Sequence, residues 1–178
     1  ACYLCPVAQG RLLAVFLLSG AAGLIYEVIW VRQFGNIFGN TVSSASLVVA
    51  VFVCGLGAGG ALAGSWADRR HRTDPGAPLR LYARIEIAIA GVGVLNAWLL
   101  PALAGAAAPF SSYVAGEHGW QVLSSGSYFV RYLAAIVLLL PVTALMGATL
   151  TLVIRFLVAS DVASASSRIS LLYAVNTL

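Results

Sequence analysis

Apolar and polar positions in this chain alternate in long blocks, not residue by residue. The apolar blocks cover residues 12–31, 42–66, 81–103 and 128–158. A helix needs about 20 apolar residues to cross the hydrocarbon core of a bilayer, whereas a membrane strand shows alternation along a shorter segment. The pattern therefore predicts four complete transmembrane helices.

A fifth helix is predicted to start near Arg168, but the chain stops at Leu178, well short of a full span. A helix that ends inside a membrane leaves unpaired carbonyl groups in lipid, which is costly. We therefore expect the polypeptide to continue beyond Leu178. The polar segment 104–127 contains aromatic residues and is expected to hold a short helix at the membrane surface.

The fourth apolar block is longer than one bilayer crossing and contains Pro141. Proline lacks an amide hydrogen and clashes with the preceding turn, so we expect the helix to kink or break there. Gly147 is expected to add flexibility to the same block.

Composition supports a membrane protein. Of the 178 residues, 61% are hydrophobic and only 9% are charged, whereas about a quarter of the residues in a soluble domain are charged. The sequence therefore predicts an all-α transmembrane bundle, with residues 1–178 forming one domain and no soluble domain. The lipid bilayer is its first expected partner.

The basic residues are ten arginines and no lysine, with a net charge of +4. They flank the apolar blocks, which favours an orientation signal over nucleic-acid binding. With the N-terminus in the cytoplasm, eight arginines lie on that side and only Arg32 and Arg131 on the other. This bias predicts a multi-pass protein with a cytoplasmic N-terminus.

Metal, cofactor and catalytic signals are weak. Cys2 and Cys5 form a C-x-x-C pair, but a lone pair at a terminus is only half of a zinc site. Cys54 lies in an apolar block and is interpreted as a packing residue. Neither His71 nor His118 has a companion at ligand spacing. We expect no metal, no cofactor and no catalytic residue within this chain.

The segment from Gly55 to Gly60 matches the G-x-G-x-x-G pattern of dinucleotide-binding proteins. That pattern needs a strand before it, yet here it lies in a helical block. Glycines four residues apart form a smooth stripe on which another helix can pack closely. We therefore interpret four glycines as a helix-packing surface: Gly55, Gly59, Gly60 and Gly64.

Glu27 is the most informative polar residue because an acid within a span is costly and is a functional candidate by default. We predict an intramembrane polar site around it, formed by Tyr26, Glu27, Trp30, Arg32 and Arg131. Its depth in the helix predicts an ion pair with Arg131, with Arg32 as the competing partner. A structural ion pair is favoured over a site for a cation or a proton.

Glu86 is a second acid within an apolar block, near the cytoplasmic end. We predict that it joins a cytoplasmic charge network with Asp68, Arg69 and Arg70, with Arg84 or Arg155 as possible contacts. Whether Asp68 and its neighbours clamp helix ends or only mark orientation is left open.

Three segments carry a family resemblance: residues 19–32 with 38–41, residues 57–69, and residues 145–150 with 172–177. Together they resemble the membrane region of bacterial fused spermidine-synthase-like proteins, which is similar to major facilitator transporters. The stretch from Gly64 to Arg70 resembles the facilitators' motif after their second helix. One departure is Thr151, where the family usually has proline.

The resemblance implies a bacterial inner-membrane domain that anchors or supplies a soluble aminopropyltransferase-like domain, which this chain does not contain. Two alternatives stay open. One is a transporter-like module for a small solute, with cationic solutes included, and the other is a structural subunit of a larger membrane complex. Further helices, a soluble domain or other subunits are its expected partners, and nucleic acid is not.

Overall fold

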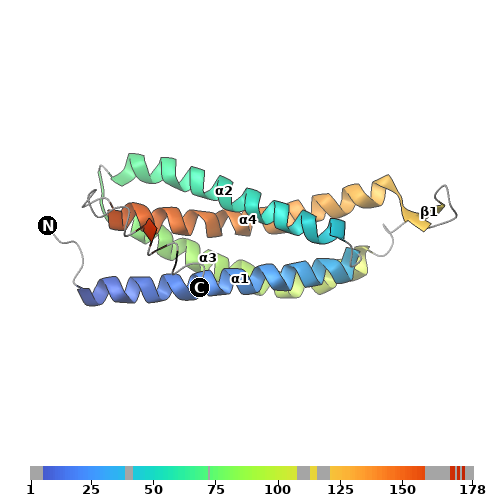
Figure 1. Cartoon of the computed structure of the whole chain (residues 1–178), viewed down its shortest axis with the longest axis horizontal. Helices are drawn as coiled ribbons and strands as arrows, with labels where there is room; N and C mark the ends of the chain where they lie inside the picture. The colour runs from blue at the N-terminus through green and yellow to red at the C-terminus, as the bar shows by residue number, and fades with distance from the viewer. Residues whose placement is uncertain are drawn as a thin grey trace.

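The computed structural model describes residues 6–38, 42–71, 73–107, 113–115, 121–158, 169, 170, 172 and 174. Its helices are α1 (Pro6–Phe38), α2 (Val42–His71), α3 (Ala77–Ala107) and α4 (Ser125–Val158). Figure 1 shows them as long rods that lie side by side, with consecutive helices running in opposite directions. The chain is therefore a helical bundle of the kind found in membrane proteins.

Three helices are long and apolar enough to cross a membrane, judged by length and composition over the described residues. These spans are Gly10–Asn36, Val42–Arg70 and Ser125–Leu157, in α1, α2 and α4. Three of the four predicted spans are thus supported by the described residues. Helix α3 carries Arg80, Arg84, Glu86 and Asn96 among its apolar residues and is not among these three spans.

The helices also extend beyond the predicted apolar blocks, since helical hydrogen bonding continues into the polar flanks. The connection between α3 and α4 contains two short strands, β1 (Tyr113–Ala115) and β2 (Gln121–Leu123). They pair antiparallel, with Tyr113 opposite Leu123. The surface helix expected in this segment is thus replaced, over the described residues, by a small hairpin. After α4, residues 169, 170, 172 and 174 have helical backbone, and Leu172 is buried in the core.

Helix α4 is continuous through Pro141, so the predicted break is wrong. Its ribbon changes direction near the middle, the part that contains Pro141 (Figure 1). The hydroxyl of Thr143 donates to the carbonyl oxygens of Leu139 and Leu140, at 2.9 and 3.1 Å. Such back-bonding by threonine is associated with helix bending. Proline and threonine therefore bend α4 without interrupting it, and Gly147 marks a packing contact described below.

Helices α2 and α4 form the tightest contact in the bundle. A methyl group added at Gly55 would collide with Thr143, and one added at Gly59 would collide with the backbone of Ala144. From the other side, Gly147 of α4 lies against the backbone of Leu56. A methyl group added at Gly60 would lie only 3.2 Å from Oγ1 of Thr151, and one added at Gly64 would lie 3.4 Å from its Cγ2. The predicted glycine stripe on α2 therefore packs against α4.

Helix α1 also contacts α3, although α3 packs more extensively against α4 and α1 packs more extensively against α2. Large aromatic side chains fill the space beside them, and Phe16, Trp30 and Phe34 of α1 are almost completely buried. The ring of Phe16 meets that of Tyr82 of α3 at 6.5 Å between centroids. The α1–α3 contact is thus made through large side chains and not through backbone contact.

Candidate functional site

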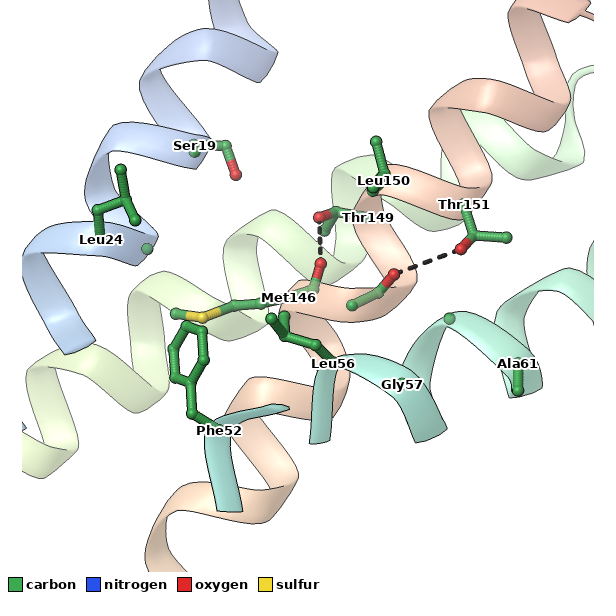
Figure 2. A pocket seen from close by; sticks show the side chains of 14 residues that line it. Ser19, Leu24, Phe52, Leu56, Gly57, Ala61, Met146, Thr149, Leu150 and Thr151 are labelled. Carbon is green, nitrogen blue, oxygen red and sulfur yellow. Dashed lines mark hydrogen bonds between the residues drawn. The ribbon is translucent and has the colours of Figure 1, made fainter. Parts of the chain in front are cut away.

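A cavity of about 490 Å³ lies between α1, α2 and α4. Figure 2 shows side chains from these helices converging on it, with Leu24 on one side and Leu56 on the other. Its walls are Ser19, Gly20, Gly23, Leu24, Phe52, Leu56, Gly57, Gly60, Ala61, Met146, Gly147, Thr149, Leu150 and Thr151. The volume falls in the range of small-molecule sites.

Small residues create this space. Gly57 and Ala61 stand one helical turn apart on α2, so they share a face and leave room beside it. Gly20 and Gly23 do the same on α1, and a methyl group at Gly23 would only touch the Met146 sulfur, at 3.9 Å. The flexible side chain of Met146 therefore closes one side of the cavity and can repack around different contents.

The polar groups in the cavity wall are hydroxyls. Thr149 donates to the carbonyl of Met146 at 2.6 Å, and Thr151 donates to the carbonyl of Gly147 at 3.4 Å (Figure 2). These two bonds remain within α4. Ser19 differs because its hydroxyl crosses to another helix and donates to Oε1 of Glu86 at 2.7 Å. A carboxylate on α3 is thereby linked to the cavity wall through one side chain.

This contact changes the interpretation of Glu86. The sequence placed it in a network with Asp68, Arg69 and Arg70, but its described hydrogen bond is to Ser19 on α1. Asp68 instead pairs with Arg155 of α4, with 2.9 Å between Oδ1 and Nε. Both side chains of that pair are exposed to a large extent, and Arg69 and Arg70 are exposed as well. Glu86 and Asp68 therefore belong to separate contacts.

The predicted site around Glu27 is only partly assembled. Tyr26 and Trp30 stack, with ring centroids 5.5 Å apart and planes 11° from parallel. The Tyr26 hydroxyl lies against Gly93 of α3, where any larger residue would collide with it. Glu27 is half-buried and does not line the cavity, while Arg32 is exposed. The α1 face that carries Tyr26 and Trp30 therefore contacts α3.

The proposed partner of Glu27 lies outside the described side chains. Arg131 is part of α4, but its side chain is not among those that the structure describes. The predicted Glu27–Arg131 pair therefore stays a prediction.

Metal-ligand chemistry is equally limited within the described chain. No group of three or more His, Cys, Asp and Glu residues there is arranged to hold a metal ion. Cys54 is a free, exposed thiol, and Cys2 and Cys5 lie outside the described residues.

No protein-family model, curated protein or solved structure matches the chain. The function is therefore inferred from the residues and contacts of the site.

Sequence reasoning passed over three residues that form the cavity. Ser19 and Met146 lie inside the segments that carry the family resemblance, yet neither was singled out. Thr149 was likewise treated only as part of a motif. A signal was present for Ser19: it is a hydroxyl in an apolar helix one turn before Gly23, on the face that small residues leave open.

Proposed function

We propose that this chain is the membrane domain of a spermidine-synthase-like protein, and that it anchors or supplies a soluble aminopropyltransferase-like domain in the same polypeptide. In this proposal α3 is the fourth span, the N-terminus is cytoplasmic, and the membrane is the bacterial inner membrane. The excess of arginine on one side of the apolar blocks supports that orientation.

The convergence of the three family-like segments on one cavity carries this proposal. All of the cavity's lining residues except Phe52, Leu56 and Thr151 belong to segments 19–32, 57–69 and 145–150. These segments lie far apart in the sequence and on three different helices. A resemblance due only to apolar composition would have no reason to gather at one place. The cavity is therefore the best candidate for what the resembling sequences share, and a small solute is its natural content.

The test fills the cavity without disturbing the bundle. Gly57 lines the cavity, and a methyl group there would meet nothing within 4 Å. Gly57→Phe in the full-length polypeptide should place a ring in the cavity and lower aminopropyl transfer by membranes that contain the protein. Gly91→Phe is the matched control, because Gly91 also faces open space but lies on α3, away from the cavity.

The outcomes separate the parts of the proposal. If Gly57→Phe lowers aminopropyl transfer and Gly91→Phe does not, the result supports supply of a solute to the soluble domain through the cavity. Equal transfer by both variants leaves anchoring as the role of this domain. A wild-type polypeptide without any aminopropyl transfer would contradict the proposal.

A transporter-like module for a small cationic solute is the second candidate. The observation that favours it is the Ser19–Glu86 hydrogen bond, which places a carboxylate one side chain away from the cavity. Acids within membrane spans commonly mark ion and substrate paths. The test measures uptake of a small amine by vesicles that contain the full-length protein. Uptake that is lost in Glu86→Gln, by a wild-type protein that shows no aminopropyl transfer, would favour this function over the first.

A further inference from the structure

A second pocket, of about 280 Å³, lies where α2 ends and α3 begins. It is separate from the cavity described above and shares no residue with it. Its walls combine three arginines, one acid and a tryptophan with apolar residues: Trp66, Arg70, Asp74, Ala77, Arg80, Leu81 and Arg84.

The turn between the two helices is held by Asp74. Its Oδ1 accepts a hydrogen bond from the amide of Gly76 at 3.1 Å, and its carbonyl accepts one from the amide of Ala77 at 3.1 Å. Its carboxylate also forms an ion pair with Arg80. Asp74 and Arg80 therefore neutralise each other, and the two hydrogen bonds of Asp74 fix the turn that forms one wall of the pocket.

Among the described side chains of this pocket, Arg70 and Arg84 remain as the unbalanced charges. The nearby acids are occupied elsewhere, since Asp68 pairs with Arg155 and Glu86 accepts from Ser19. Within the described part of the chain, no carboxylate pairs with the guanidinium group of Arg70 or Arg84. The pocket thus combines fixed walls with an excess of positive charge.

The position of the pocket relative to the membrane indicates which kind of anion it binds. The apolar span of α2 ends at Arg70, so the pocket lies at the boundary between hydrocarbon and headgroups. Trp66 is half-buried there, and tryptophan is enriched at that depth. The start of α3 adds the partial positive charge of a helix N-terminus. Guanidinium groups pair well with phosphate oxygens, often through two hydrogen bonds.

We propose that this pocket binds a phosphate group, and that the phosphodiester of an anionic phospholipid is its occupant. An orientation signal requires only positive charge near the span, whereas this site also has a cavity, a fixed acid–arginine wall and an aromatic side. The proposal is independent of the function proposed above, because it uses neither the solute cavity nor a soluble domain. A free phosphate compound offers the same chemistry, so the experiment has to separate the two sources.

The experiment measures lipid retention by the full-length protein. The purified protein is placed in phosphatidylcholine nanodiscs with increasing phosphatidylglycerol, and bound lipid is counted by native mass spectrometry. Arg70→Gln should weaken phosphatidylglycerol binding about fivefold, and Arg70→Gln with Arg84→Gln about thirtyfold, from the usual contribution of one arginine near an anionic surface. Arg69→Gln is the matched control, since Arg69 is the exposed neighbour that does not line the pocket.

A parallel arm measures binding of labelled inorganic phosphate in nanodiscs made only of phosphatidylcholine. Circular dichroism confirms that all variants keep their helices. Lipid retention lowered by the pocket variants and not by Arg69→Gln supports the lipid site. Phosphate binding that is lost in the double variant, with unchanged lipid retention, would assign the pocket to a free phosphate compound and overturn the lipid assignment. Equal effects of Arg69→Gln and Arg70→Gln, or no binding in either arm, would overturn the phosphate site itself.

Discussion

The α2–α4 contact and the α1–α3 contact of this bundle are made by different means. Helices α2 and α4 come into backbone contact at Gly59 and Gly147, and Gly55 leaves room for the side chain of Thr143. Helices α1 and α3 meet through side chains, including the Ser19–Glu86 hydrogen bond and the contact of Tyr26 with Gly93. Only 6% of the most apolar stretch of α1 is buried, against 33% in α2 and in α4.

This difference indicates which helices can move. Lipid is as apolar as a leucine side chain, so close van der Waals packing and interhelical hydrogen bonds hold membrane helices together. The α2–α4 pair is held by close van der Waals packing, and we call this rigid pair of helices the frame. Helix α1 depends on a few specific contacts, and it forms one wall of the cavity. A change in cavity shape is therefore expected to come from α1 moving against that frame.

The largest expected effect comes from crowding the frame. Gly59→Ala adds a methyl group that collides with the backbone of Ala144, so the helices must separate. We expect a loss of about 3 kcal/mol in the free energy of unfolding, near the upper end for overpacking. Reversible unfolding in mixed detergent micelles measures it.

Gly57→Ala is the control for that substitution, because it makes the same change on the same helix with nothing within 4 Å. It should alter stability by less than about 1 kcal/mol, with helix propensity acting in its favour. Equal losses in the two variants would remove the distinction between a packed frame and a looser α1–α3 contact.

A smaller effect is expected from the hydrogen bond between α1 and α3. Ser19→Ala and Glu86→Leu, made singly and together, form a double-mutant cycle. We expect a coupling energy of about 1 kcal/mol, which is typical of interhelical hydrogen bonds in membranes. Unfolding free energies of the four proteins provide the measurement.

Ser65→Ala serves as the comparison in that cycle. The Ser65 hydroxyl donates to the carbonyl of Leu62 in its own helix, at 2.9 Å, so it should show no coupling to Glu86→Leu. A coupling energy near zero for Ser19 would mean that the α1–α3 contact does not depend on this bond.

The smallest effect is expected at the exposed end of the frame. Asp68→Asn removes the ion pair with Arg155, whose side chains are 64% and 38% exposed. Exposed pairs contribute little, so the loss should stay below about 1 kcal/mol and shrink further as salt is added. Unfolding at low and high sodium chloride concentration tests this. A larger loss that is insensitive to salt would show that this pair, and not only the glycines, ties α2 to α4.

Much of the fold followed from block length and residue spacing. The apolar blocks located all four long helices, and the spacing of Gly55 and Gly59 identified the packing face of α2. Three of these helices, α1, α2 and α4, are long and apolar enough to cross a membrane over the described residues. The hairpin in the connection after α3 had no clear signal, since each of its strands has only three residues.

The contact partners of individual side chains were harder to predict than the helix face that packs against a neighbour. The position of Glu86 along its helix was readable from the sequence, but its rotation about the helix axis was not, and that rotation turns it toward Ser19. Pro141 showed where α4 would deviate, yet the sequence could not tell a bend from a break. Near the proline, the hydroxyl of Thr143 donates to the carbonyls of Leu139 and Leu140, a contact associated with helix bending.

The length of α4 has a consequence for the lipid around it. From Tyr128, whose ring contacts that of Tyr132, to Arg155, the helix rises about 40 Å, close to the full thickness of a bilayer with its headgroups. Aromatic and basic side chains are thus fixed at opposite surfaces by one bent rod. A thinner bilayer would oblige that rod to tilt or bend further. Because Gly147 and Thr149 on the same helix wall the cavity, the room available inside would then depend on membrane thickness.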